Sequence, residues 1–234
     1  MQSRRVLIVG GSSGIGAAAA KVFAKEGARV LIVSRDAVKL ERVVAEADTS
    51  LETAVLDITR NGDVEDFFAS QDAFDHVVIS AAQTATGPVR QLALENAIAA
   101  MDSKFWGAYR VAKAARINDG GSLTFVSGFL AIRPNRMSVL QGAINAALEA
   151  LARGLALELA PVRVNTVSPG LIATPLWSRM DSSARDTMFE SAAARLPVRR
   201  VGQAEDVAQA ILYVASNGYA TGSTVLVDGG GAIA

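Results

Sequence analysis

The stretch VLIVGGSSGIGAAAAKVF, residues 6–23, decides the fold of this chain. Its apolar start is typical of a buried strand and its alanine-rich end of a helix, and Gly10, Gly14 and Gly16 lie between them. Without side chains the backbone can turn sharply and approach a phosphate, whose charge is favoured by the free N–H groups and dipole of a helix N-terminus. We therefore predict a nucleotide site in this loop. Its predicted contact residues are Gly10, Ser12, Ser13, Gly14, Ile15 and Gly16.

The alternation of strand and helix continues along the chain. We predict strands at 5–9, 29–33, 53–56, 76–80, 122–127, 162–168 and 224–228. We predict helices at about 14–26, 36–47, 60–70, 91–117, 139–160, 177–193 and 204–216. Short apolar strands separated by helices indicate βαβ units and a parallel sheet covered on both faces. No linker or repeat interrupts the pattern, so residues 1–234 are predicted to form one domain.

The composition argues against several classes of protein. Acidic and basic residues are interspersed and the net charge is zero, so nothing favours a nucleic acid or a membrane as partner. The chain has no cysteine and one histidine, and its carboxylates show no grouped spacing, so we expect no disulfide and no metal site. The first apolar run is too short for a signal peptide, and no segment approaches the roughly 18 apolar residues of a membrane span. We expect a cytoplasmic protein.

The end of the second strand, SRD at residues 34–36, is where such a fold selects its dinucleotide. A guanidinium there pairs with the 2′-phosphate of NADP, whereas a carboxylate accepts the ribose hydroxyl of NAD. Ser34 can hydrogen-bond either, and Asp36 either binds the ribose or caps the next helix. Arg35 therefore favours NADP(H) over NAD(H).

The glycine loop also matches the G-x-S-x-G pattern of α/β-hydrolases, with Ser12 as the nucleophile. A hydrolase needs a histidine beside that serine, and the only histidine is His76. His76 begins a predicted strand whereas Ser12 follows the end of another, which separates them by about 13 Å in a parallel sheet. We reject the hydrolase and expect His76 to be a strand-edge residue without a catalytic role.

Three motifs in this order resemble the short-chain dehydrogenase/reductase family. They are the glycines at 10–16, the segment LALELAPVRVNTVSPG at 155–170 and the ending TGSTVLVDGG at 221–230. The resemblance covers essentially the whole chain. It implies a Rossmann-like doubly wound domain with a seven-stranded parallel sheet, a dimer or tetramer, and hydride exchange between a nicotinamide cofactor and a carbonyl or alcohol.

The resemblance extends to most cofactor positions. Ser34 stands where NAD-preferring members are acidic, Arg35 where NADP-preferring members are basic, and Asp57 where an acid contacts the adenine. The segment expected along the nicotinamide and its phosphates contains Pro169, Gly170, Ile172 and Thr174. ISAA at 79–82 replaces the usual NNAG, which removes two amides that support the central strands.

The usual catalytic residues of the family are absent. Its Tyr and Lys fall on Gln141 and Asn145, its Ser on Gly128 and its helix Asn on Lys104. The oxygen of a reduced carbonyl becomes an alkoxide that needs a proton. The family's tyrosine supplies that proton, but the amide of Gln141 cannot do so at neutral pH, and Gly128 has no side chain.

Lys104 is the candidate replacement. The family's geometry places it near Asn145, so we predict that its ammonium fills the vacated space and binds an anionic substrate or protonates the alkoxide, with Gln141 as a hydrogen-bond donor. A surface lysine is the alternative. Strand alternation predicts that Ser127 points to the other face from Gly128. The loop residues Arg133 and Arg136 either bind a carboxylate or phosphate or are simply solvated.

Two functions stay open. One is an NADP(H)-binding protein with a degenerate site and no usual redox turnover, and the other is an NADP(H)-dependent oxidoreductase of a carbonyl or activated double bond that uses Lys104. In both, the nearly all-apolar helix 139–160 predicts a homodimer or homotetramer. The helix 177–193 matches the family's mobile lid, and its large apolar residues either form a wall over the substrate or pack on the body: Trp177, Met180, Met188 and Phe189.

Overall fold

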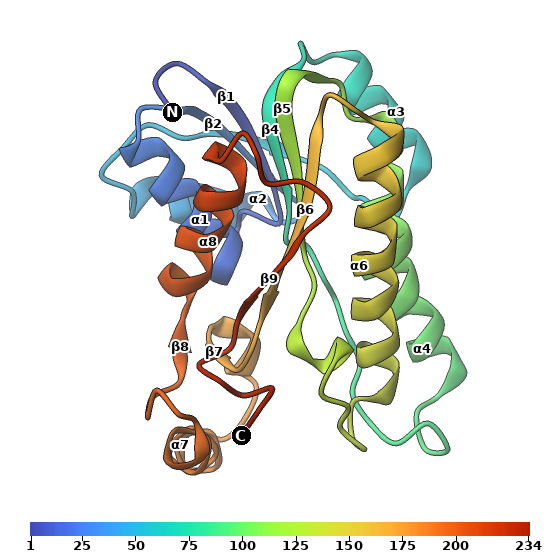
Figure 1. The fold of residues 1–234 in the computed structure, drawn as a ribbon, viewed down its shortest axis with the longest axis vertical. Coiled ribbons are helices and arrows are strands. Elements are labelled where there is room, and N and C mark those ends of the chain that lie inside the picture. The colour runs from blue at the N-terminus through green and yellow to red at the C-terminus, as the bar shows by residue number, and fades with distance from the viewer.

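The sheet has the predicted architecture. In the computed structural model, which describes residues 1–234, seven parallel strands lie in the order β3-β2-β1-β4-β5-β6-β9 (Figure 1). The order reverses between β1 and β4, which is the switch point where such sheets bind ligands. The strands are β1 (Arg5–Val9), β2 (Arg29–Ser34), β3 (Glu52–Val55), β4 (Phe74–Ile79), β5 (Ile117–Val126), β6 (Arg163–Pro169) and β9 (Thr224–Val227). The predicted doubly wound α/β fold is confirmed.

Helices cover both faces of the sheet, because alternate strand residues face opposite sides. Val6 and Ile8 of β1 belong to one buried cluster, and Leu7 and Val9 belong to the other. The first cluster is covered by α1 (Gly14–Lys25), α2 (Ala37–Ala45) and α8 (Ala204–Ser216). The second is covered by α3 (Asn61–Ala69), α5 (Gly107–Ala114) and α6 (Val139–Glu158). None of the helices is both long and apolar enough to cross a lipid bilayer.

The predicted helix 91–117 differs from the structure. It is divided into α4 (Leu94–Met101), a π-helical turn η1 (Asp102–Trp106) and α5. After this turn the helix packs closely on the segment between β3 and α3. A β-carbon at Gly107 would lie 2.7 Å from the Ile58 side chain in that segment. Single π turns inside helices are frequent at functional sites, and this one carries Lys104.

Other boundaries differ by a few residues. β5 begins at Ile117, five positions before the predicted strand at 122. Pro175 starts a short 3-10 turn η3 (Pro175–Trp177), and α7 (Ser182–Arg195) begins only after Asp181, whose side chain caps it, rather than at residue 177. Two short strands, β7 (Ile172–Ala173) and β8 (Gly202–Gln203), pair beside the main sheet, and η2 (Phe129–Ala131) follows β5.

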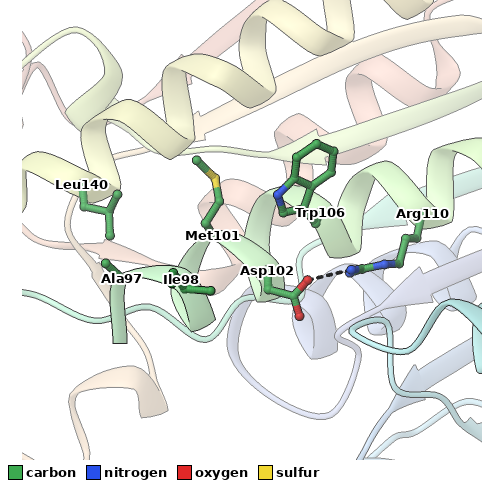
Figure 2. A pocket seen from close by; sticks show the side chains of 7 residues that line it. All are labelled: Ala97, Ile98, Met101, Asp102, Trp106, Arg110 and Leu140. Atoms are coloured by element: carbon green, nitrogen blue, oxygen red, sulfur yellow. Dashed lines mark hydrogen bonds and ion pairs between the residues drawn. The ribbon is translucent and has the colours of Figure 1, made fainter. Parts of the chain in front are cut away.

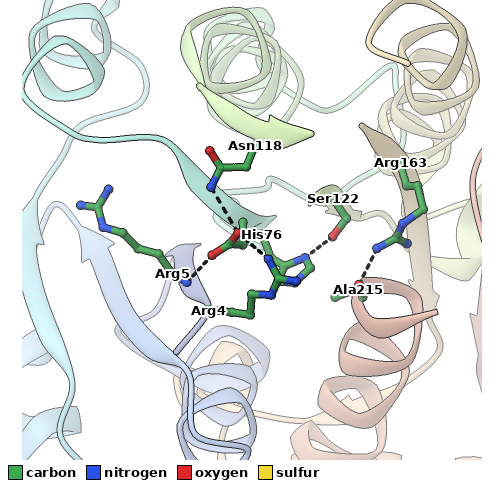
Figure 3. A network of polar contacts seen from close by, with 8 residues as sticks. Arg4, Arg5, His76, Asn118, Ser122, Arg163 and Ala215 are labelled. Atoms are coloured by element: carbon green, nitrogen blue, oxygen red, sulfur yellow. Dashed lines mark hydrogen bonds and ion pairs between the residues drawn. The ribbon is translucent and has the colours of Figure 1, made fainter. Parts of the chain in front are cut away.

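His76 is the third residue of β4, not its first, and is buried in a polar network at the amino ends of the strands (Figure 3). Its Nδ1 lies 2.9 Å from the Oγ of Ser122. Arg163 of β6 is paired with Ser122 of β5, and its guanidinium donates to the carbonyls of Val214 and Ala215 at the end of α8. Burial lowers the pKa of His76 to about 4, so the imidazole is neutral in the folded protein at neutral pH. The expectation of a strand-edge histidine is wrong because the strand starts earlier, at Phe74.

Candidate functional site

The glycine loop joins β1 to α1 at the switch point and has no room for a side chain at Gly10 or Gly16. A β-carbon at Gly10 would lie 2.5 Å from the backbone N of Ala81 after β4, and one at Gly16 would collide with the carbonyl of Gly10. Gly10 also has a φ of 91°, in the region that favours glycine. Ser13 precedes α1, but its side chain caps none of the helix N–H groups. These N–H groups therefore remain available to an anion, and the loop fits a dinucleotide phosphate.

The altered segment after β4 still ties the central strands together. Ser80 Oγ donates to the carbonyl of Val9 at 3.2 Å, and the backbone N–H groups of Ser80 and Ala81 donate to that carbonyl at 2.9 and 3.1 Å. This hydroxyl provides a side-chain link between β4 and β1 without the amides expected at 79–82. The link holds the loop close to the end of β4.

The second strand ends at Ser34, and Arg35 and Asp36 follow it. Arg35 is exposed at the carboxyl edge of the sheet, and its Nη2 donates to Gln83 Oε1 at 3.0 Å. Asp36 accepts from the Lys39 N–H at 3.1 Å and so caps α2, as its alternative interpretation stated. The Ser34 hydroxyl hydrogen-bonds the main chain of Asp36 at 3.2 Å. Arg35 is therefore the only charged side chain of the three that is not held by α2.

Asp57 lies in the segment after β3 and is half-buried. Its Oδ1 accepts from the Thr59 N–H at 3.0 Å and from the Thr59 hydroxyl at 2.7 Å. Burial raises the pKa of Asp57, but the Thr59 hydrogen bonds and the charge of Arg35 outweigh it and lower the pKa below its ordinary value. The carboxylate stays ionised, and its Oδ2 is not used by a protein donor.

The segment from Pro169 to Thr174 returns to the glycine loop. The Gly170 N–H donates to the carbonyl of Val227 at 2.9 Å, and Ile172 is buried in β7. Thr174 faces Gly14, since a β-carbon on that glycine would lie 3.4 Å from the Cβ of Thr174. Two segments separated by about 155 residues, both predicted to contact the cofactor, therefore lie side by side.

Lys104 points into the site rather than into solvent. Its Nζ donates to Asn145 Oδ1 at 2.6 Å and to the Ser127 carbonyl at 2.9 Å. The three residues come from η1, the loop directly after β5, and α6. Burial lowers the pKa of Lys104 to about 8, against the opposing charge of Glu149. The predicted approach of Lys104 to Asn145 is thus present.

Gly128 and Gln141 are the other two residues predicted at the family's catalytic positions. A β-carbon at Gly128 would lie 2.7 Å from Asn145 Nδ2, so the glycine makes room for that amide. Gln141 lies four residues before Asn145 on α6 and therefore on the same helix face. The side chain of Gln141 makes no hydrogen bond within the protein, which leaves its donor and acceptor available to a ligand.

Ser127 faces α6, contrary to the strand alternation. Its Oγ donates to Glu149 Oε1 at 2.9 Å, and a side chain at Gly128 would also meet α6. The alternation fails because β5 ends at Val126, so Ser127 lies in the following loop. Glu149 was not among the predicted site residues. Its signal in the sequence is a carboxylate in the otherwise apolar stretch AALEALA of residues 146–152.

In the predicted lid, Trp177 at the start is held by contacts with the protein, whereas most of α7 is not buried. Trp177 Nε1 donates to the carbonyl of Ile172 at 2.9 Å, and its ring meets the ring of Phe189 edge-on at 6.4 Å between centroids. Ala192 is the only buried residue of α7, and in Figure 1 this helix lies beyond the carboxyl ends of the strands. The loop residues Arg133 and Arg136 are exposed and form no ion pair.

Comparison with known proteins agrees with this geometry. The family model described as enoyl-(acyl carrier protein) reductase matches residues 9–231. The chain is 32% identical to D-erythrulose reductase of Gallus gallus, over 98% of this chain and 96% of the relative. It is 31% identical to the 3-oxoacyl-[acyl-carrier-protein] reductase FabG of Thermotoga maritima, over 98% of both. A small-chain dehydrogenase crystallised with NADPH superposes with a TM-score of 0.87, at 35% identity over 100% of both chains.

The fold and the glycine loop at the switch point define a nucleotide-binding class of Rossmann type. Within that class, the chain belongs to the short-chain dehydrogenase/reductase family.

Proposed function

We propose that this protein is an NADP(H)-dependent oxidoreductase that acts on a carbonyl or activated double bond and uses Lys104 as its proton donor. The observation that carries the proposal is the position of the Lys104 ammonium, which is held by Asn145 Oδ1 and the Ser127 carbonyl. The alignment assigns Lys104 and Asn145 to positions of the family's catalytic residues. An ammonium has three N–H donors. Two are taken by the protein, so the third is free for a substrate oxygen.

The residues that would hold the cofactor are the glycine loop, Arg35, Asp57 and the segment 169–174. The uncapped N–H groups of α1 suit the pyrophosphate, and Arg35 suits the 2′-phosphate of NADP. Arg35 now donates to Gln83, a neutral acceptor that a phosphate can replace. When bound, the reduced dinucleotide supplies hydride.

The role of Lys104 follows from its protonation. Burial lowers its pKa to about 8, so near neutral pH most molecules carry the ammonium while the proton remains easier to release than from a solvated lysine. As the substrate oxygen gains negative charge, Nζ donates a hydrogen bond and then its proton. The neutral amine remains bound to Asn145 and regains a proton from water. The side-chain amide of Gln141 can donate a second hydrogen bond to the same oxygen.

The names of relatives are consistent with carbonyl chemistry. They include a carbonyl reductase family member 4 of Danio rerio, 29% identical over 97% of this chain. Together with the ketose and 3-oxoacyl reductases named above, they support an aldehyde, ketone or enone as the substrate class.

A second candidate is a dinucleotide-binding protein without redox turnover. It is favoured by Gly128 and Gln141, which place no hydroxyl group where the family has a serine and a tyrosine. The two candidates agree on NADP(H) binding and differ in whether the bound dinucleotide is oxidised.

The test combines cofactor titration with a turnover assay. NADPH and NADH are titrated into the full-length protein, and the complex is incubated with aldehydes, ketones and enones while the cofactor absorbance is followed. We expect tighter binding of NADPH, and an oxidation rate that Lys104→Met lowers at least a hundredfold with NADPH affinity unchanged. The matched control is Lys113→Met, at an exposed lysine of α5. Binding without oxidation of any panel member by wild type would favour the second candidate, and equal rates for both variants would refute the role of Lys104.

We further propose that the protein is a homo-oligomer. The outer side of the helix that carries Lys104 has a groove of about 640 Å³, lined mainly by apolar side chains of α4, η1 and α6 (Figure 2). Ile98 and Trp106 in this groove and the neighbouring Tyr109 are exposed, and such patches are typical of protein interfaces. Sedimentation velocity is expected to give a dimer or tetramer that Ile98→Asp dissociates, whereas a concentration-independent wild-type monomer would refute the proposal.

A further inference from the structure

A buried carboxylate lies behind the proposed proton donor. Glu149 is on α6, four residues after Asn145, and is 8% exposed. Ionised carboxylates are rarely buried without a compensating charge or several donors. Ser127 is the only side chain that donates to Glu149, at 2.9 Å. One neutral hydroxyl compensates little of the cost of burying a carboxylate, so a nearby positive charge is needed to stabilise Glu149.

That positive charge is Lys104. The two charged groups make no direct ion pair; Ser127 connects them, because its carbonyl accepts from Nζ at 2.9 Å and its hydroxyl donates to Glu149. Asn145 holds the same ammonium from one helical turn away. Asn145 of α6 and Ser127, directly after β5, therefore form the binding site of the Lys104 ammonium together.

The other charged groups around η1 are engaged elsewhere or exposed. Asp102 on η1 pairs with Arg110 of α5 at 2.7 Å, as Figure 2 shows. Glu95 of α4, Lys113 of α5 and Arg153 of α6 are exposed to solvent. Glu149 is the charge that acts on Lys104, and its negative field opposes the effect of burial on the pKa of that lysine.

We propose that Glu149 is a positioning residue for Lys104. Its carboxylate, acting through Ser127, balances the charge of the ammonium and holds it with one N–H directed at the substrate. The inference deepens the proposed function and rests on it for its catalytic meaning, but the coupling between the two side chains is measurable without turnover. The carboxylate itself does not touch the substrate.

The test is a lysine titration by NMR. The full chain has five lysines, at positions 21, 25, 39, 104 and 113, so protein labelled with ¹³C-lysine gives few Cε signals, and Lys104→Met assigns the relevant one. Glu149→Gln keeps the shape of the side chain and an acceptor for Ser127 but removes the charge. We expect the titration midpoint of Lys104 to fall by about one pH unit or more in this variant, with the other four lysines unchanged.

Three further variants make the test decisive. Glu158→Gln removes an exposed carboxylate at the end of the same helix and is expected to leave Lys104 unchanged. Glu149→Asp keeps the charge and is expected to restore most of the wild-type midpoint. Glu149→Leu carries the test if the glutamine variant does not fold, because leucine fills similar space without a charge, and a lowered pKa lets Lys104 become neutral instead of staying an uncompensated buried cation. An unchanged Lys104 midpoint in folded Glu149→Gln or Glu149→Leu protein would overturn the proposal.

A pH profile of kcat separates this inference from the proposed function. If the proposed function and the positioning role are both correct, Glu149→Gln moves the alkaline limb of the kcat profile to lower pH. The shift equals the shift of the Lys104 titration midpoint. A shifted midpoint in a protein that oxidises no NADPH supports the positioning and contradicts the proposed function. NADPH turnover that is lost in Lys104→Met, together with a Lys104 titration midpoint that Glu149→Gln leaves unchanged, supports the proposed function and contradicts the positioning role of Glu149.

Discussion

The substitution Gly128→Ser introduces a serine where the alignment predicts the family's serine, yet we expect it to damage this site. A β-carbon at position 128 would lie 2.7 Å from Asn145 Nδ2, and the same amide accepts from Lys104 at 2.6 Å. Asn145 must therefore turn away and lose its bond to the ammonium. A hydrogen bond to a charged group contributes about 1.5–3 kcal/mol and overpacking costs about 1–3 kcal/mol. Since relaxation reduces both terms, we expect the free energy of unfolding to fall by about 1–3 kcal/mol.

A double-mutant cycle measures this coupling. Urea unfolding at neutral pH is compared for wild type, Gly128→Ser, Asn145→Ala and the double variant. With the amide removed, the serine has no close neighbour at Asn145, so the coupling energy is expected to be about 1 kcal/mol or more. Gly154→Ser on the exposed side of α6 is the matched control, because a β-carbon there meets nothing within 4 Å. If Gly128→Ser lowers stability equally in both backgrounds, or not at all, the steric argument is wrong.

Three other predictions concern the cofactor, the proton donor and the buried histidine. Arg35→Ala is expected to weaken NADPH binding tenfold or more and to leave NADH binding almost unchanged by calorimetry, since only NADPH carries the 2′-phosphate that the guanidinium would bind; equal losses for both would reject this assignment. Because the ammonium of Lys104 is the acid and its pKa is lowered to about 8, kcat is expected to be level below that pH and to fall about tenfold per pH unit above it; a level rate up to about pH 10 would contradict this. Burial lowers the pKa of His76 from 6.5 to about 4, so its stabilising contribution is complete above pH 6.5 and is lost as the pH falls to 4, by about 3 kcal/mol in total. The Hε1 resonance of this only histidine, together with urea unfolding of wild type and His76→Gln, tests that slope; an NMR midpoint near 6.5 would refute it.

The sequence by itself determined the fold and the place of the glycine loop between β1 and α1, because the signals for both are local. The glycines at 10, 14 and 16 follow from the backbone shape that a phosphate loop needs, and the apolar runs of β1, β2 and β4 follow from burial on both faces. The sequence also predicts that Gln141, Asn145 and Gly128 stand where the family has its tyrosine, lysine and serine, since this alignment depends only on counting back from the segment at 153–161. The contact between Lys104 and Asn145 could be predicted only through the family's geometry.

The tertiary structure decided what surrounds that lysine. The π turn that carries Lys104 leaves no clear mark in the residues 102–106, and the strand alternation assigned Ser127 to the wrong face because β5 ends one residue earlier. Glu149 looked like one charge on an apolar helix until α6 packed against the end of β5 and brought it behind Ser127. Local patterns report the backbone conformation and the buried face of each element, whereas charge compensation between residues 104, 127 and 149 depends on how three elements pack, and no local pattern contains that information.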